Sequence, residues 1–206
     1  MTEFNIPDFL NDCLKELANV GGGHATGALS QLLSRKVNLG VPYVRFVLLN
    51  QMKEKQVEKG EKIIAVYSRV HDENMGGNLI VTFPWKASQI LKVNLLADGV
   101  SHNEEITQKD EIRFKEVGDA LFQSYSEAVN NFLALNLTYS ESKFILSTPH
   151  TLMDLIIEGT NSEYALVVST KFDVEGMSID GDLELSFIPR ELEKFTELLK
   201  KNFGMG

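Results

Sequence analysis

The segment GNLIVTFP at residues 77–84 has a counterpart, GDLELSF, at residues 181–187, and Pro189 follows the second copy. Both segments are rich in apolar residues and bounded by turn formers, which is typical of strands. A proline directly after such a strand suits the first turn of a helix. The two copies lie about a hundred residues apart in a chain of 206. This spacing predicts an internal duplication, in which each half ends with strand, proline and helix.

Working outward from the two copies gives the same order of elements in both halves. In the first half, hydrophobic periodicity predicts a long amphipathic helix, three strands and a second helix, at residues 7–34, 43–49, 62–70, 78–83 and 84–96. In the second half it predicts a long helix, three strands and a final helix, at residues 107–134, 137–146, 164–174, 179–187 and 189–201.

A helix–β–β–β–helix unit used twice predicts an α+β fold. We expect one continuous, mainly antiparallel sheet with the two long helices on one face and pseudo-twofold symmetry between the halves. The pseudo-repeats span approximately residues 7–100 and 105–206. No Gly-, Ser- or Pro-rich linker separates them, so we expect residues 1–206 to form a single domain.

The charge and composition of the chain disfavour several classes of binding partner. The formal net charge is −9 and the pI is about 5.0, which disfavours binding to nucleic acid or to anionic membranes. No apolar run approaches the length of a membrane span, and the N-terminus is acidic, so we expect a cytoplasmic protein without membrane insertion. Cys13 is the one cysteine, and the four histidines lack ligand-like spacing, so no metal site is expected.

The first long helix carries a polar stripe. Asp12, Glu16 and Asn19 are spaced i, i+4 and i+7, which places them on one side, opposite the Leu and Cys face. The second long helix repeats part of this pattern with Glu116 and Asp119. Solvated helix faces often carry such residues without any function, so the spacing alone is a moderate signal.

Three adjacent glycines, residues 21–23, follow the stripe within the same predicted helix. Glycine weakens a helix interior relative to alanine. The run therefore predicts either a kink or a place where another segment comes close, from within the chain or from a docked partner.

The stripe is part of a longer motif. The chain reads Asp12-x3-Glu16-x2-Asn19-x22-Pro42. This motif resembles that of the CheC, CheX and FliY chemotaxis phosphatases, and the resemblance extends over essentially the whole chain, most closely to CheC. It implies a phosphatase that removes the phosphoryl group from the aspartyl phosphate of a CheY-like response regulator.

The resemblance also implies roles for individual residues. Asn19 would position the hydrolytic water, Glu16 would pair with the regulator's lysine, and Asp12 would assist docking. The regulator would supply its own Mg²⁺, so no cofactor of this chain's own is expected. CheD, the family's receptor-modifying deamidase partner, is expected as a second partner, and the free chain is expected to be a monomer.

The second copy of the motif departs from the family pattern. Ile112 stands where Asp or Ser is expected, Asp119 replaces the Asn, and Ser142 replaces the Pro, while Glu116 is retained. A carboxylate only accepts hydrogen bonds and repels phosphoryl oxygens. We therefore expect Glu116 and Asp119 to form a second site that is weak or silent.

Other readings stay open at this point. The chain could be a CheD-binding adaptor, with little or no catalysis, that regulates chemoreceptor modification. A CheX-like obligate dimer is disfavoured because CheX-type chains carry one motif and pair between subunits. A FliY-type rotor component is disfavoured because no rotor-binding segment follows Gly206.

Overall fold

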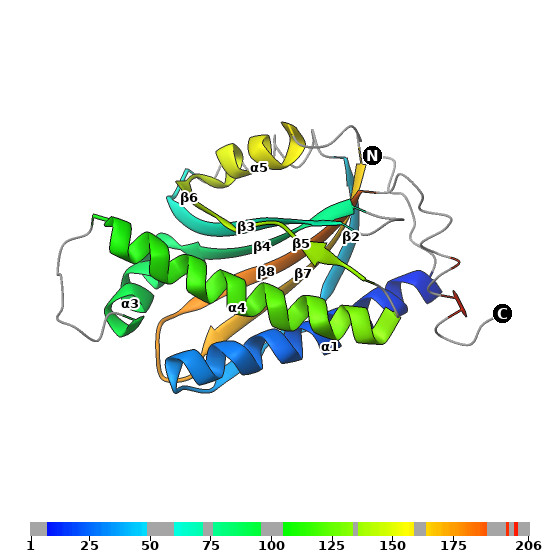
Figure 1. Ribbon diagram of the computed structural model, residues 1–206, viewed down its shortest axis with the longest axis horizontal. Helices are drawn as coiled ribbons and strands as arrows, with labels where there is room; N and C mark the ends of the chain where they lie inside the picture. The colour runs from blue at the N-terminus through cyan, green and yellow to red at the C-terminus, as the bar shows by residue number, and fades with distance from the viewer. Residues whose placement is uncertain are drawn as a thin grey trace.

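An eight-stranded sheet joins the two halves of the chain in the computed structural model, and every pairing within it is antiparallel (Figure 1). The structure describes residues 8–48, 60–71, 76–95, 105–133, 136–158 and 164–188, with Glu197, Lys200 and Lys201. The strands are β1 (Val37–Leu39), β2 (Tyr43–Leu48), β3 (Ile63–His71), β4 (Gly76–Pro84), β5 (Thr138–Tyr139), β6 (Lys143–Ser147), β7 (Tyr164–Val174) and β8 (Asp180–Ile188).

The two similar segments, residues 77–84 in β4 and residues 181–187 in β8, lie side by side at the centre of this sheet. The strand order is β1-β7-β8-β4-β3-β5, with β2 paired to β7 and β6 paired to β3. Ile80 of β4 is opposite Glu184 of β8, and both are the fourth residue of their copy. The outer strands also match, since β1 and β2 pair with β7 as β5 and β6 pair with β3.

These pairings confirm the predicted α+β fold and its antiparallel sheet. The pseudo-twofold symmetry expected between the two halves stays a prediction. Descent of the two halves from one duplicated unit stays a prediction.

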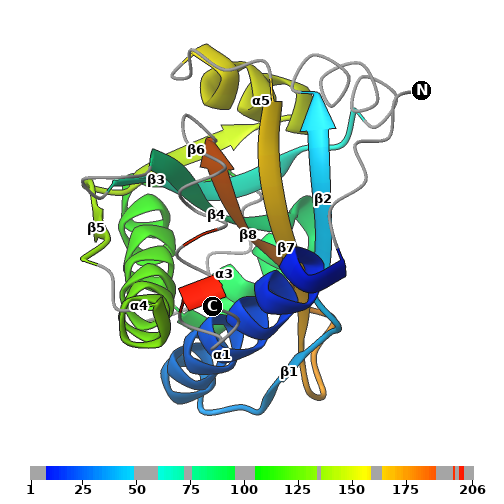
Figure 2. The same cartoon turned by 90° about the vertical axis from the view of Figure 1, so that its right-hand side faces the viewer.

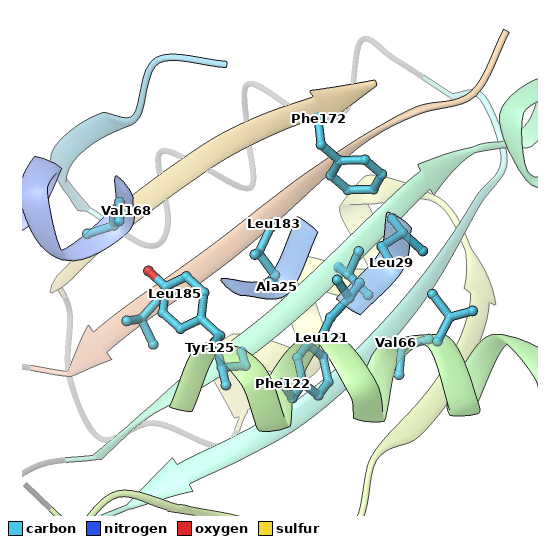
Figure 3. Close-up of a cluster of buried hydrophobic side chains, with 14 of the residues drawn as sticks. Ala25, Leu29, Val66, Leu121, Phe122, Tyr125, Val168, Phe172, Leu183 and Leu185 are labelled. Atoms are coloured by element: carbon cyan, nitrogen blue, oxygen red, sulfur yellow. The ribbon is translucent and has the colours of Figure 1, made fainter. Parts of the chain in front are cut away.

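Two long helices, α1 (Asp8–Leu33) and α4 (Gln108–Leu133), run antiparallel across one face of the sheet (Figures 1 and 2). Each presents apolar residues to the strands at three-to-four-residue spacing, as expected for an amphipathic helix. Figure 3 shows Ala25 and Leu29 of α1 and Leu121 and Phe122 of α4 in one buried cluster above the strands. The predicted placement of both long helices on one face is correct.

The glycines of α1 separate into two kinds. The helix continues through residues 21–23 without a break, so the expected kink is absent. A Cβ on Gly21 would lie 2.8 Å from the Tyr125 ring of α4, and a Cβ on Gly22 would lie 3.1 Å from the Leu39 side chain of β1. No atom of the described residues lies within 4 Å of a Cβ built on Gly23. Close internal packing thus accounts for Gly21 and Gly22 only.

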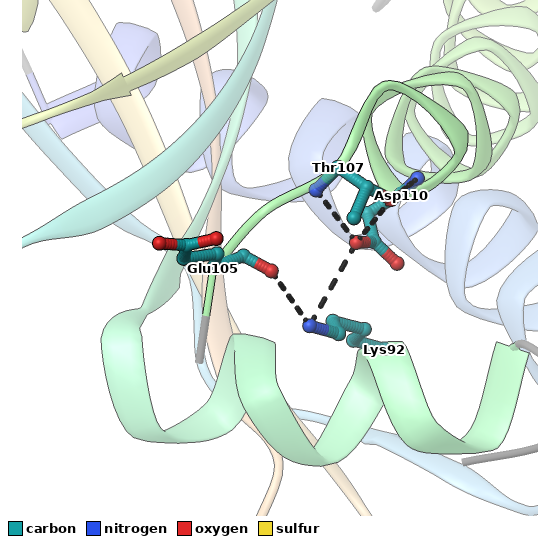
Figure 4. Close-up of polar contacts among 4 residues, drawn as sticks. All are labelled: Lys92, Glu105, Thr107 and Asp110. Atoms are coloured by element: carbon teal, nitrogen blue, oxygen red, sulfur yellow. Dashed lines mark hydrogen bonds and ion pairs between the residues drawn. The ribbon is translucent and has the colours of Figure 1, made fainter. Parts of the chain in front are cut away.

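A buried ion pair fixes the start of α4 (Figure 4). Lys92, in α3 (Trp85–Leu95), donates to the Glu105 carbonyl at 2.9 Å and lies 3.7 Å from the Asp110 carboxylate. The same carboxylate accepts hydrogen bonds from the backbone N–H and the hydroxyl of Thr107, at 2.8 and 2.7 Å. The Asp110 N–H donates in return to the Thr107 hydroxyl at 3.3 Å. This reciprocal cap satisfies two amides that would otherwise lack partners at the helix start.

Several sequence predictions need correction. Helix α5 (Pro149–Glu158) was not predicted; its Leu152 is buried on the opposite face of the sheet, beside Tyr67 and Ile80. The strand expected at residues 137–146 is two strands, β5 and β6, and the short strand β1 was missed. Pro84, expected to open a helix, ends β4 opposite Ile63 of β3, and α3 begins at Trp85, whose N–H still donates to the Lys62 carbonyl at 3.1 Å. The helix expected at residues 189–201 lies outside the described residues except for Glu197, Lys200 and Lys201, which are helical.

Replacing Gly118 with alanine should lower the free energy of unfolding by about 1–3 kcal/mol, although alanine favours a helix. A Cβ at Gly118 would collide with the β-branched Val66 side chain of β3, on which α4 rests. Urea denaturation measures the change. Gly27→Ala is the matched control, because a Cβ there meets open space and should leave stability unchanged or slightly raised. Equal stability of Gly118→Ala and wild type would contradict the close packing of α4 against Val66.

Candidate functional site

The polar stripe predicted on the first helix lies on the solvent side of α1. Asp12, Glu16 and Asn19 are all exposed, whereas Leu14 and Leu17 between them are fully buried. Within the described ranges, no hydrogen bond or ion pair engages these three side chains. The structure therefore brings together two carboxylates and one amide that are available to an incoming molecule.

Pro42, the last element of the motif, is placed differently from the stripe. It is buried in the connection between β1 and β2. The neighbouring Gly40 N–H donates to the Lys171 carbonyl at 2.8 Å, which ties this connection to β7. Leu39, at the end of β1, packs against Gly22 of α1. Pro42 thus belongs to the scaffold beneath the helix.

The matching face of α4 carries internal contacts instead of free groups. The Glu116 carboxylate accepts a hydrogen bond from the Arg113 guanidinium at 2.8 Å. The Lys115 ammonium lies 3.3 Å from the carboxylate of Glu141, in the connection between β5 and β6. Such exposed pairs contribute little to stability. They do, however, engage the Glu116 carboxylate, whereas the Glu16 carboxylate on α1 has no such partner among the described residues.

Comparison with known proteins identifies relatives of this architecture. No family model matches the chain. The chain is 25% identical over 178 residues to the CheY-P phosphatase CheC of Bacillus subtilis, covering 82% of this chain and 83% of CheC.

Solved structures share the fold at lower identity. FliY of Thermotoga maritima superposes with a TM-score of 0.75 at 18% identity, covering 97% of this chain and 99% of that one. The chemotaxis protein CheX of Desulfovibrio desulfuricans superposes with a TM-score of 0.55 at 16% identity, covering 84% and 97%. The predicted resemblance to the CheC, CheX and FliY family is confirmed.

In this CheC-like chain the two halves differ at the aligned motif positions. Ile112, where the family motif has Asp or Ser, is 52% exposed and offers no polar group. Asp119, in place of Asn, is half-buried. Ser142, in place of Pro, is buried, and its hydroxyl has no hydrogen-bond partner among the described residues. Two of the three departures from the motif, Ile112 and Asp119, therefore lie on α4, and the third, Ser142, lies in the connection between β5 and β6.

Asp119 lies in an acidic environment next to Tyr139 of β5. Burial raises the pKa of the Tyr139 phenol, and the carboxylates of Asp119 and Glu127 raise it further. Glu127 also accepts a hydrogen bond from Gln123 at 2.9 Å. The α4 face thus presents the Asp119 carboxylate at the position where α1 presents the uncharged Asn19 amide.

Three further features of the described residues concern metal ligands, membrane spans and the cysteine. No group of three or more His, Cys, Asp or Glu residues there is arranged to hold a metal ion. None of its helices has the length and apolar character needed to cross a bilayer. Cys13 is buried in the core, and its thiol pKa is raised by burial and by Asp12, which disfavours the reactive thiolate.

The ion pairs on the exposed face of α4 were not predicted from the sequence. The i, i+3 spacing of Arg113 and Glu116 was a readable signal, because such residues are neighbours on a helix. The contact between Lys115 and Glu141 was not, since it joins α4 to a connection that only the fold brings alongside.

Asp119→Asn should lower the pKa of Tyr139, because it removes a carboxylate that stabilises the neutral phenol. Spectrophotometric titration of wild type and variant, each compared with a Tyr139→Phe partner to isolate this tyrosine, measures the shift. Asp12→Asn, on the other helix, is the control and should leave the Tyr139 titration unchanged. An unchanged titration in Asp119→Asn would mean that the carboxylate does not face the phenol.

Proposed function

We propose that this chain is a phosphatase that hydrolyses the aspartyl phosphate of a CheY-like response regulator. The observation that carries the proposal is the free stripe of Asp12, Glu16 and Asn19 on α1, in a chain similar to a CheY-P phosphatase. The substrate would be the surface of another protein. An exposed helix face can contact such a surface more easily than an enclosed pocket can.

Asn19 is proposed to act on the water. An aspartyl phosphate is a mixed anhydride that hydrolyses slowly unaided, so the phosphatase needs to supply neither a nucleophile nor a metal. The regulator would contribute its own Mg²⁺ and lysine. The remaining task is to hold a water in line with the breaking P–O bond, and positioning of this kind is a main source of rate in phosphoryl transfer.

An amide side chain is suited to that task. The Asn19 carbonyl can accept a hydrogen bond from the water, while its NH₂ can donate to a phosphoryl oxygen. It adds no negative charge beside a group that is already anionic. The exposure of Asn19 and its freedom from contacts within the described ranges leave both functions available.

Glu16 is proposed to pair with the regulator's lysine, and Asp12 to assist docking. Glu16 lies one turn before Asn19 on the same face, so one docked surface can contact both. A charge-assisted contact would orient the regulator so that its phosphoryl group meets the amide. A free carboxylate is needed for this, and on α4 the equivalent Glu116 is already paired with Arg113.

The second face is proposed to be catalytically silent. Asp119 cannot donate a hydrogen bond when ionised, and its charge would oppose the approach of a phosphoryl group. The ion pairs of Glu116 and Lys115 would also have to break before a regulator could use that face. One working site per chain is therefore expected.

Wild-type protein should accelerate the loss of phosphate from the phosphorylated CheY-like regulator of the same organism. Asn19→Ala should lose most of that acceleration, about a hundredfold or more, because the water is no longer placed. Asp119→Ala is the matched control on the second face and should change the rate little. Decay is followed by release of inorganic phosphate at fixed regulator concentration.

Two results would contradict this assignment. An effect of Asp119→Ala as large as that of Asn19→Ala would move the chemistry to α4. A decay rate that wild type leaves unchanged even with CheD present would remove the catalytic function, and binding of CheD without hydrolysis would then favour the adaptor function.

A further inference from the structure

Gly23 is an unexplained glycine in the interior of a long helix. Glycine in such a position costs helix stability relative to alanine, because it has more backbone freedom to lose. At Gly21 and Gly22 that cost is matched by close packing against Tyr125 and Leu39. At Gly23 no described atom would meet an added Cβ, and the residue is exposed. Packing against the described residues therefore does not require glycine at this position.

Gly23 lies in line with the polar stripe of Asp12, Glu16 and Asn19. It follows Asn19 by four residues and Glu16 by seven, so it lies on the same line of the helix surface. The stripe thus ends in a place where the α1 backbone carries no side chain. A surface docked on Glu16 and Asn19 would lie directly over it.

The matching helix lacks this clearance. A hundred residues later, α4 has Gln123 at the corresponding position, and its amide donates to Glu127 at 2.9 Å. The same face carries the Glu116 and Arg113 ion pair. Glycine therefore occurs on α1, beside the complete motif. On α4, beside the incomplete motif, the same position carries the hydrogen-bonded Gln123 side chain.

We propose that Gly23 is a specificity-determining residue of the reaction proposed above: it leaves α1 bare beside Asn19, so that the phosphorylated face of a response regulator can come close enough for the amide to reach its water. This inference rests on the proposed function. Gly23 takes no part in the chemistry; it sets how near the two surfaces come.

A side chain at this position should affect docking and folding in opposite directions. Gly23→Gln adds a better helix former in open space, so the melting temperature should stay the same or rise by about 2–4 °C. The same side chain would hold the regulator away from the helix. The KM for phosphorylated regulator should then rise roughly tenfold or more, because a side chain inserted into a close interface displaces the docked surface.

The experiment measures phosphate release over a range of phosphorylated regulator concentrations, with melting curves for every variant. Gly23→Ala, Gly23→Gln and the control Gly27→Gln are compared with wild type and Asn19→Ala. Gly27 is also exposed and free of described neighbours, but lies a further turn from Asn19. A graded increase in KM from alanine to glutamine at residue 23, with intact folding and a wild-type KM for Gly27→Gln, supports the proposal.

The failures of the two proposals are distinguishable. If wild type accelerates decay and Asn19→Ala does not, while Gly23→Gln has the wild-type KM, the clearance role is overturned and the proposed function stands. An equal rise in KM for Gly27→Gln would also overturn a specific role for Gly23. If wild type itself is inactive, both proposals fall together.

Discussion

The packing of α1 against α4 is the constraint on which the rest of the structure depends. The Tyr125 ring lies where a side chain on Gly21 would have to be, so the two helices approach closely over the centre of the sheet. Tyr125 is buried, and burial raises the pKa of its phenol, which keeps the group neutral in the core. With the apolar faces of both helices used in this way, the opposite face of each is left to solvent. The stripe of Asp12, Glu16 and Asn19 is exposed for that reason.

The two halves of the chain use matched scaffolds with different surfaces. Central strands, outer strands and long helices pair in corresponding registers. On α1 the exposed face is unpaired within the described residues and ends in bare backbone at Gly23. On α4 it is joined by ion pairs and carries Asp119 near Tyr139. A chain of this kind can keep its fold while the exposed faces of its two long helices differ in charge and in side-chain pairing.

The sequence predicted the helices and strands correctly where the spacing of apolar residues matches the pattern of burial. The two central strands follow from the similar segments at residues 77–84 and 181–187, and the amphipathic helices and the acid–amide stripe follow from hydrophobic periodicity. The structure places all of them as predicted. The sequence was less informative where a segment is short or its partner is distant. Strand β5 has two residues, and α5 is defined by the apolar sheet face that Leu152 covers. The buried pair of Lys92 and Asp110 was missed because only the fold brings α3 to the start of α4. The glycine run was ambiguous, because close packing and open clearance look the same in sequence.

The central claim is that one regulator docks on α1 and none on α4, and a binding footprint tests it most directly. The labelled chain would be titrated with the same organism's regulator carrying a stable beryllofluoride mimic of its phosphate, and backbone amide shifts would be followed by NMR. The account predicts shifts concentrated at residues 12–23 of α1, with residues 116–127 of α4 unchanged. Shifts centred on α4, or on the sheet face beneath α5 with α1 unaffected, would contradict it.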